Sequence, residues 1–297
     1  MAAVQYQLTE QKELLRRLCV SRSVLVAAHR GTCGGNIVQN TLGAYKNAIL
    51  HGADMLEIDA AMTVDGVFYC FHDGQEPLVL GTNKSIKTMK STEVETYQLI
   101  NSLNHKIGEK VNRLDDVLEA LKGKCLINID RSWFYWEEII KTLDRHHMAG
   151  QILLKSPVQD RLLAALEASG SDLMYMPIVY HRTDIETVEK YNVHFAAAEL
   201  IFETEDNLLL EDGYIEALHQ KGLLLWANAI TLDDRHILCA LKDDNTAILK
   251  GPEESWGYLI RKGFDILQTD WPALMRDYVD SHRGEAARTL AQHAFSL

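Results

Sequence analysis

Two apolar segments near the start of the chain end in side chains suited to acid–base or metal chemistry. The run Val24–Ala28 is followed by His29 and Arg30, and a second run carries Glu57 and Asp59 between apolar neighbours. Successive side chains of a strand point to opposite faces, so Glu57 and Asp59 share one face. Two carboxylates on one apolar face repel each other and are costly to desolvate, which a hard divalent cation would relieve. The pattern predicts a metal site.

A third apolar run, Val67–Phe71, ends in His72. Histidine titrates near neutral pH, and the Arg30 guanidinium supplies a fixed positive charge. We expect His29, His72 and Arg30 to meet the two carboxylates at one place. A titratable pair, a cationic anchor and a metal site together indicate an enzyme.

Strand-like and helix-like segments alternate along the chain. The eight apolar segments of strand length are Val24–Ala28, Met55–Asp59, Cys125–Asp130, Ile152–Leu154, Leu173–Tyr180, Phe195–Phe202, Leu223–Ala227 and Asp265–Thr269. Between them lie amphipathic segments at Thr41–Leu50, Trp136–His146, Gln159–Ala168, Thr183–Tyr191, Glu211–Gln220 and Glu253–Lys262. Eight such repeats predict an α/β fold, a (β/α)₈ TIM barrel. A doubly wound open sheet is the alternative, but no GxGxxG follows a strand.

The chain has no evident linker, since Gly and Pro are sparse and no low-complexity segment occurs. We therefore expect residues 1–297 to form a single domain. Val64–Val111 (residues 64–111) is too long for a simple connection between strand and helix. We expect it to hold the hairpin that delivers His72 and a small insertion after the second strand.

Active sites of such barrels lie at the carboxyl ends of the strands. Further polar residues occur at or near these ends, as that rule demands: Asp130, Lys155, Glu199, Trp226 with Asn228, and Asp270. For Asp270 we expect the more ordinary role of capping the next helix.

The amino-acid composition limits which binding partners and which cellular compartment we expect for this protein. With 30 Lys and Arg against 42 Asp and Glu, the net charge is −12. The sequence has no Lys/Arg-rich stripe that would neutralise a phosphate backbone, so we do not expect nucleic acid as a partner. No run reaches the roughly 18 apolar residues of a membrane span, and no signal-peptide pattern opens the chain. The cysteines, five in number and without CxxC spacing, argue against a disulfide framework. We expect a cytoplasmic protein without stable membrane insertion, and leave homo-oligomerisation open.

Several short motifs occur along the chain in an order that is typical of one enzyme family. They are His29-Arg30-Gly31, Asn40-Thr41, Gly52-Ala53-Asp54, Glu57-Ile58-Asp59, Thr63-Val64-Asp65-Gly66, His72-Asp73, Trp226-Ala227-Asn228 and Thr269-Asp270-Trp271-Pro272. In this order the chain resembles the glycerophosphodiester phosphodiesterase family, which shares a barrel superfamily with phosphatidylinositol-specific phospholipases C.

The chain departs from that family's pattern at three positions. Gln39 stands where the family usually has Glu before Asn-Thr. In the family's Asn-x-Glu-x-Lys run, Asp130 replaces the Glu and Ser132 replaces the Lys. Lys155, at the end of the next strand, is placed to restore the missing charge, although a solvated surface lysine is the alternative.

The resemblance implies hydrolysis of glycerophosphodiesters, small-molecule substrates, to sn-glycerol 3-phosphate and an alcohol. It implies that Glu57, Asp59 and Asp130 hold one divalent cation, Mg²⁺ or Ca²⁺. Arg30 and Lys155 would bind the phosphate.

His29 would activate the nucleophile, water or a substrate hydroxyl, and His72 would protonate the leaving group, with the reverse assignment left open. The other substrate-binding candidates are Trp226, Asn228 and Glu199. Trp226 could instead be barrel packing, and Glu199 could instead satisfy a core partner. A phospholipase-like enzyme acting on choline or inositol lipids, and a non-catalytic barrel that binds a phosphoryl ligand, remain the alternative functions.

Overall fold

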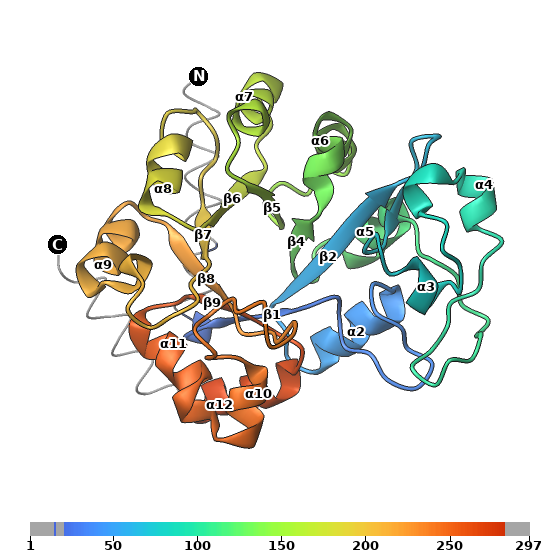
Figure 1. The fold of residues 1–297 in the computed structure, drawn as a ribbon. Coiled ribbons are helices and arrows are strands. Elements are labelled where there is room, and N and C mark those ends of the chain that lie inside the picture. The colour runs from blue at the N-terminus through green and yellow to red at the C-terminus, as the bar shows by residue number, and fades with distance from the viewer. Residues whose placement is uncertain (1–14, 16–20, 283–297) are drawn as a thin grey trace.

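The structure is a computed structural model that describes Leu15 and residues 21–282 (Figure 1). Its barrel strands are β1 (Leu25–Ala28), β2 (Met55–Met62), β4 (Leu126–Asp130), β5 (Ile152–Pro157), β6 (Met174–Val179), β7 (Ala197–Leu200), β8 (Leu224–Asn228) and β9 (Ile266–Thr269). All eight predicted strands are present, each within three residues of the expected ends. One of the five cysteines, Cys19, lies outside the described residues.

The eight strands form a closed parallel barrel. Neighbours run in the order β1-β9-β8-β7-β6-β5-β4-β2, and β1 also pairs with β2, which closes the ring. A short strand, β3 (Phe68–Cys70), pairs antiparallel with the far end of β2. The structure thus confirms the predicted (β/α)₈ barrel and the hairpin that precedes His72.

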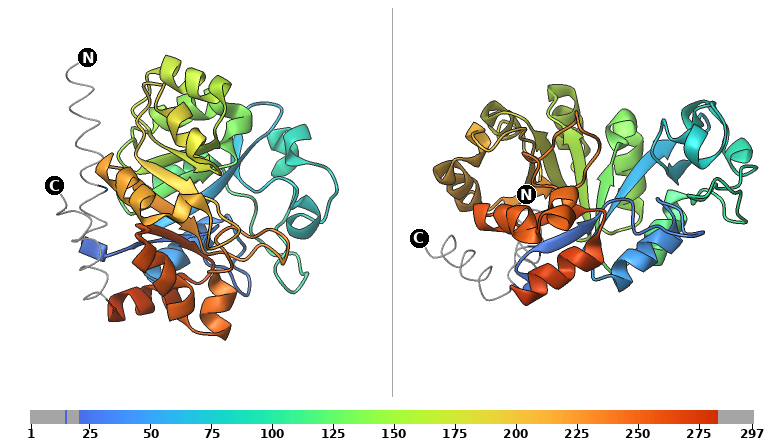
Figure 2. Two further views of the ribbon diagram at one scale, coloured as in Figure 1. Left: turned by 60° about the vertical axis from the view of Figure 1, so that its left-hand side comes forward. Right: turned by 60° about the horizontal axis from the view of Figure 1, so that its bottom comes forward.

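Helices surround the barrel on its outside (Figures 1 and 2). They are α2 (Leu42–Leu50), α5 (Leu114–Leu121), α6 (Trp136–Arg145), α7 (Asp160–Ser169), α8 (Arg182–Val188), α9 (Asp212–Gln220), α10 (Asp244–Leu249), α11 (Trp256–Lys262) and α12 (Pro272–Ser281). Short 3₁₀ turns are η1 (Ile86–Thr88), η2 (Ser132–Tyr135), η3 (Leu208–Leu210) and η4 (Pro252–Glu254). Three of these helices, α5, α10 and α12, were not among the predicted ones. Among the described residues, no helix combines the length and apolar character needed to cross a bilayer.

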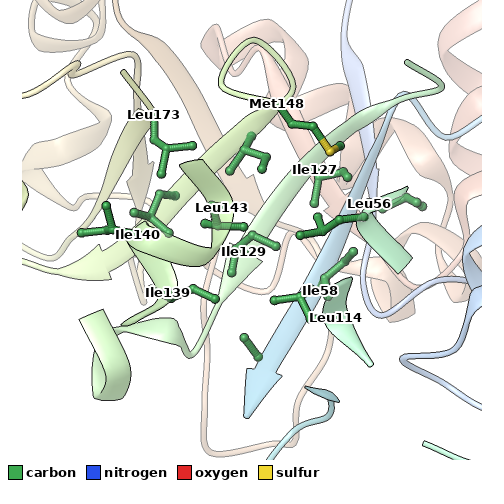
Figure 3. Packing of buried hydrophobic residues seen from close by; sticks show 14 of the residues in the cluster. Leu56, Ile58, Leu114, Ile127, Ile129, Ile139, Ile140, Leu143, Met148 and Leu173 are labelled. Atoms are coloured by element: carbon green, nitrogen blue, oxygen red, sulfur yellow. The ribbon is translucent and has the colours of Figure 1, made fainter. Parts of the chain in front are cut away.

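The two-residue period of each strand sorts side chains between the barrel interior and the helix layer. Leu56 and Ile58 of β2 pack outward among Ile127, Ile139 and Leu143 of the neighbouring elements (Figure 3). This outward packing leaves the alternate positions of β2 to face the barrel axis.

The barrel interior changes from apolar to polar along its axis. The apolar part lies nearer the strand starts and includes Leu25, Met55, Leu153, Leu224 and Ile266. Toward the carboxyl ends the inward positions become polar, and they are filled by Glu57, Asp59, Asn128, Asp130, Lys155, Glu199, Asn228 and Gln268. All but Asp130 are buried, so this polar layer has to satisfy its charges internally.

The segment between β3 and α5 forms the predicted insertion, which contains α3 (Glu76–Val79) and α4 (Ser91–Val94). It has a small apolar core of its own, with Tyr69, Ile86, Met89 and Val94 almost fully buried. Figure 1 shows it beside α2 and the end of β2. The insertion therefore borders the end of the barrel where the polar side chains gather.

Candidate active site

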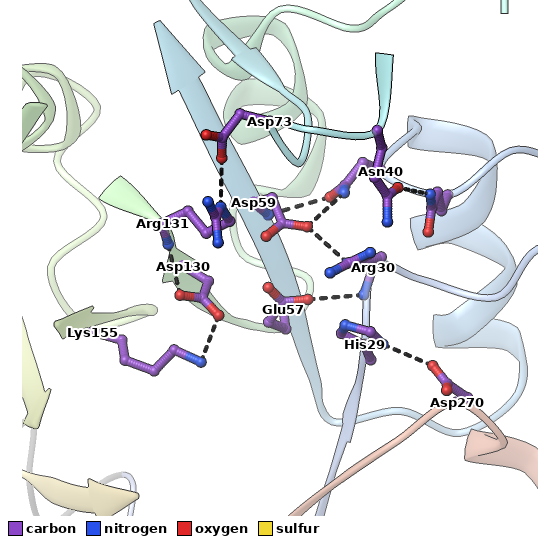
Figure 4. A network of polar contacts seen from close by, with 12 residues as sticks. His29, Arg30, Asn40, Glu57, Asp59, Asp73, Asp130, Arg131, Lys155 and Asp270 are labelled. Carbon is purple, nitrogen blue, oxygen red and sulfur yellow. Dashed lines mark hydrogen bonds and ion pairs between the residues drawn. The ribbon is translucent and has the colours of Figure 1, made fainter. Parts of the chain in front are cut away.

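Strand register brings three carboxylates together at the carboxyl end of the barrel (Figure 4). In the parallel pairing of β2 and β4, Glu57 faces Asn128 and Asp59 faces Asp130. One oxygen from each of Glu57, Asp59 and Asp130 lies within 4.8 Å of the others. The structure therefore brings together the three residues predicted as metal ligands.

The loop after β1 holds two of these carboxylates in place. The backbone N–H of Arg30 donates to Glu57 Oε2 at 3.0 Å, and its guanidinium Nε lies 2.9 Å from Asp59 Oδ2. Asn40 donates to the same Asp59 oxygen at 2.8 Å and accepts from the Asp59 N–H at 3.2 Å. Arg30 and Asn40 adopt φ of +56° and +57°, a left-handed conformation that is unfavourable for most side chains. These contacts hold the loop in that conformation.

Lys155 is buried at the barrel interior and is not a surface lysine, since only 3% of its side chain is exposed. Its Nζ lies 2.7 Å from Asp130 Oδ2 and 3.2 Å from Glu199 Oε2. Burial lowers the pKa of Lys155, but the two carboxylates more than offset this and the pKa lies above its usual value. The same ammonium holds the pKa of Asp130 below its usual value, although burial acts in the opposite direction. Lys155 and Asp130 are therefore both charged at neutral pH.

The charges of this layer do not balance without a further cation. Four carboxylates, those of Glu57, Asp59, Asp130 and Glu199, face the two cations Arg30 and Lys155, an excess of two negative charges. Burial, followed by repulsion from Asp59 and Asp130, raises the pKa of Glu57 well above its usual value. A divalent cation would supply the two missing charges and keep Glu57 ionised. The oxygen-only donor set fits a hard cation such as Mg²⁺ or Ca²⁺.

His29 is oriented by Asp270, a partner that the sequence analysis did not assign. His29 Nδ1 lies 2.8 Å from Asp270 Oδ1, which leaves Nε2 available to a substrate. Asp270 does not cap α12 as predicted, because the helix begins at Pro272 and Trp271 occupies its N-cap position. The pairing follows from barrel closure, where Ala28 of β1 lies opposite Thr269 of β9. The available signal was a carboxylate at the end of the strand that must pair with β1.

His72 follows the short strand β3. Its Nδ1 is buried and has no hydrogen-bond partner among the described residues. Burial lowers the pKa of His72, and the nearby Arg30 and Arg131 lower it further, while Asp59 opposes them. Arg131 in turn is held by Asp73, whose Oδ1 lies 2.6 Å from its Nε. His72 is therefore a neutral imidazole at pH 7 and can accept a proton.

These residues line one open cavity of about 200 Å³. His29, Arg30, Asp59, His72, Asp130, Lys155, Glu199 and Asn228 all contribute to its wall. Asn228 donates to Glu199 Oε1 at 2.6 Å and accepts from the Trp226 indole at 2.7 Å.

Two predicted site residues, Trp226 and Glu57, do not contribute to the cavity wall, although Glu57 belongs to the carboxylate cluster beside it. Trp226 lies farther from the predicted role. It is fully buried in the barrel interior, with Lys155 Nζ 5.8 Å from its ring centroid. The structure thus places Trp226 in barrel packing and not on the cavity wall.

Comparison with known proteins agrees with this geometry. A family model, DUF4996, described as a domain of unknown function, matches residues 175–279. A glycerophosphodiester phosphodiesterase of Bacillus altitudinis is 24% identical over 260 residues, which cover 83% of this chain and 94% of the relative. Further curated relatives carry the same enzyme name.

Solved structures of the same name share the fold. A glycerophosphoryl diester phosphodiesterase from Parabacteroides distasonis superposes with a TM-score of 0.71 at 16% identity, covering 89% of this chain and 90% of that one. A phosphodiesterase from Oleispira antarctica, solved in complex with the product sn-glycerol-3-phosphate, gives 0.63 at 17% identity, covering 88% and 99%. The chain is therefore similar in sequence to glycerophosphodiester phosphodiesterases and shares the fold of solved structures of that name.

The structure shows where two of the three residues that depart from the family motifs lie and what they contact. Asp130 occupies the ligand position expected of Glu and still reaches Glu57 and Asp59. Ser132, at the family's lysine position, is fully buried in η2, outside the cavity wall, and its hydroxyl has no hydrogen-bond partner among the described residues. Lys155 enters from β5 instead, as the sequence analysis expected of it.

A buried carboxylate outside the cavity, Asp244 of α10, supports the turn that carries Asp270. Asp244 accepts hydrogen bonds from the Asp270 backbone N–H at 2.8 Å, Thr269 Oγ1 at 2.8 Å and the Trp256 indole at 2.9 Å. Burial raises the pKa of Asp244 to about 7, although these donors oppose the shift. The turn between β9 and α12 is therefore fixed by a side chain that favours its protonated form.

This shift predicts a pH dependence of stability. A folded-state pKa above the unfolded value favours protonation on folding, so the stabilisation is complete below about pH 4 and is lost as pH rises toward 7. We expect the free energy of unfolding of the wild type, relative to Asp244→Asn, to fall by up to about 4 kcal/mol over that range. Urea unfolding at a series of pH values measures the difference. Parallel curves for the two proteins would contradict the shift.

Proposed function

We propose that this protein is a metal-dependent phosphodiesterase that hydrolyses glycerophosphodiesters to sn-glycerol 3-phosphate and an alcohol. The observation that carries the proposal is one cavity that His29, His72, Arg30 and Lys155 line beside the cluster of the carboxylates Glu57, Asp59 and Asp130. The similarity to named glycerophosphodiester phosphodiesterases favours the same activity, and the product complex of the Oleispira antarctica neighbour supports a small-molecule substrate.

Glu57, Asp59 and Asp130 would hold the cation, Mg²⁺ or Ca²⁺. When bound, this ion would polarise a phosphoryl oxygen and stabilise the charge that develops on it. Arg30 and Lys155 would bind the other phosphate oxygens, each already held by a carboxylate that limits its motion. Glu199 and Asn228, joined by a hydrogen bond, would contact the glycerol hydroxyls.

The environments of the two histidines favour the reverse of the assignment expected from the sequence. His72, neutral at pH 7, would act as the base and take the proton of the attacking oxygen. His29 would act as the acid, since Asp270 fixes its Nδ1 and directs Nε2 toward the leaving alkoxide. The attacking oxygen comes from water or from the neighbouring substrate hydroxyl, which would form a cyclic phosphate.

The direct test is hydrolysis of glycerophosphocholine and glycerophosphoethanolamine with and without EDTA. We expect EDTA to abolish turnover and added Mg²⁺ or Ca²⁺ to restore it. Glu57→Gln should lower metal affinity strongly, because it removes a charged ligand, whereas the surface variant Glu137→Gln should not. Metal binding without turnover of any phosphodiester would favour a non-catalytic barrel.

The two histidine roles can be separated with a good leaving group. Loss of a general acid or base should lower turnover of glycerophosphocholine by about 10² to 10⁴ in both His29→Ala and His72→Ala. Bis(p-nitrophenyl) phosphate releases a phenolate that needs no proton, so His29→Ala should retain most activity on it and His72→Ala should not. The opposite pattern would exchange the roles. Because this substrate lacks a neighbouring hydroxyl, its turnover also reports water as the nucleophile.

Lys155→Met should damage both binding and stability. The variant keeps the side-chain length but leaves Asp130 and Glu199 facing each other without a cation. Breaking a buried pair typically costs about 3–5 kcal/mol, so both kcat/KM and the unfolding free energy should fall. Lys221→Met, at a half-exposed ion pair with Glu189, is the control and should change stability by about 1 kcal/mol or less. Wild-type kinetics in Lys155→Met would remove this lysine from phosphate binding.

A further inference from the structure

One carboxylate outside the cavity wall, that of Asp244, connects the residues of the turn that carries Asp270. Thr269 is the last residue of β9, and Asp270 and Trp271 lead from it into α12. The Asp270 N–H donates to Asp244 Oδ2 at 2.8 Å, and the Thr269 hydroxyl donates to Asp244 Oδ1 at 2.8 Å. The same hydroxyl accepts from the Trp271 N–H at 2.9 Å. All three residues are therefore linked to Asp244, directly or through one hydroxyl.

Asp244 is itself held by the elements around it and is only 2% exposed. Its N–H donates to the carbonyl of Ala229, directly after β8, at 2.6 Å. The Trp256 indole of α11 donates to Asp244 Oδ1 at 2.9 Å. The neighbouring residue, Asp243, caps α10 by accepting from the Thr246 N–H at 3.0 Å. The carboxylate of Asp244 thus has a fixed position relative to β8, α10 and α11.

Asp270 depends on this backbone support, because its side chain is 45% exposed. Among the described residues, the hydrogen-bond partner of that side chain is His29, whose Nδ1 lies 2.8 Å from Asp270 Oδ1 (Figure 4). The His29 N–H also donates to the Thr269 carbonyl, at 3.1 Å. The ring and the backbone of His29 are therefore both held by the turn that Asp244 fixes. A shift of this turn would rotate the imidazole and redirect Nε2.

We propose that Asp244 is a positioning residue for the phosphodiesterase reaction, which fixes Asp270 and through it the ring of His29. This inference rests on the proposed function and adds to it a residue that acts only through His29. Orientation has a large effect on rate, since a displacement of about 1 Å caused far from the reacting atoms can cost about 100-fold. Asp244 is thus needed to orient His29, and not to bind phosphate or metal.

Asp244→Ala removes the acceptor for both the Asp270 N–H and the Thr269 hydroxyl. With metal present, we expect kcat for glycerophosphocholine to fall by about 10- to 100-fold. KM should stay within about twofold, because the residues proposed to bind phosphate and metal are unchanged. Asp244→Asn keeps an oxygen that can accept from the Asp270 N–H, so it should recover most of the loss. A folded Asp244→Ala variant with wild-type kcat would overturn the proposal.

A double-mutant cycle tests whether Asp244 acts through His29. Once His29→Ala has removed the imidazole, adding Asp244→Ala should change the remaining kcat by less than about twofold, since the two residues would act as one unit. A loss of the same 10- to 100-fold size in both backgrounds would overturn the proposal and make Asp244 a structural residue of the barrel. The comparison holds whichever histidine is the acid.

Asp265→Ala is the matched control, because Asp265 is another buried carboxylate and lies at the opposite end of β9. It accepts from the Leu225 N–H at 2.8 Å and does not line the cavity. This variant should lower the free energy of unfolding while leaving kcat of the folded enzyme within about twofold. A loss of kcat as large as that of Asp244→Ala would show that any weakening of β9 suffices, against a specific role for Asp244.

Thr269→Val keeps the test possible if Asp244→Ala does not fold. Valine has nearly the same shape as threonine but lacks the hydroxyl that links Asp244 to the Trp271 N–H. We expect a fall in kcat in the wild-type background that disappears in the His29→Ala background, and equal losses in both would overturn the proposal. A wild type that hydrolyses no phosphodiester would refute the proposed function itself, whereas an active wild type with unaffected variants rejects only the positioning role.

Discussion

The polar layer at the carboxyl end of the barrel depends on charge compensation among buried carboxylates. Glu57 and Asp59 are each 1% exposed, and with Asp130 they place three acidic groups within 4.8 Å. Such a group is stable only if cations and hydrogen-bond donors offset both desolvation and repulsion. Arg30, Asn40 and Lys155 meet part of this requirement, and a divalent cation would meet the rest. The cluster proposed to bind metal therefore needs the same compensation for this end of the barrel to fold.

Asp130 on β4 and Lys155 on β5 together provide the acidic and basic side chains that the family's Asn-x-Glu-x-Lys run has on one segment. Asp130 has a shorter side chain than the Glu it replaces, and its Oδ2 lies 2.7 Å from Lys155 on the adjacent strand. A lysine from the next strand needs a partner near the strand end, and Glu199 on β7 supplies a second one. Compared with the family motif, the lysine stands one strand along the barrel, at ion-pair distance from Asp130 and Glu199. Ser132, relieved of that role, has become a buried residue of η2.

The loop between β1 and α2 and the insertion between β3 and α5 each contribute to two cavities. Their inner ends carry Arg30 and His72 to the cavity beside the carboxylates, and their outer parts line a second cavity of about 490 Å³. The insertion has its own apolar core, so its surface can differ from that of other barrels without disturbing the β-strands. Loops on a rigid barrel are the usual place where enzymes of one fold acquire different substrates.

The sequence by itself determined the strands, most helices and the members of the carboxylate cluster. The reason is local: a two-residue apolar period fixes which side chains face inward, so Glu57 and Asp59 had to share the face opposite Leu56 and Ile58. Contacts between distant strands were decided only by the tertiary structure. Closure of β1 against β9 brought Asp270 to His29, and not to the helix end where a local pattern would place it. Burial likewise decided that Trp226 packs inside the barrel, and that Lys155 pairs with Asp130 and Glu199. These outcomes depend on barrel register and three-dimensional closure, which no spacing along the chain encodes.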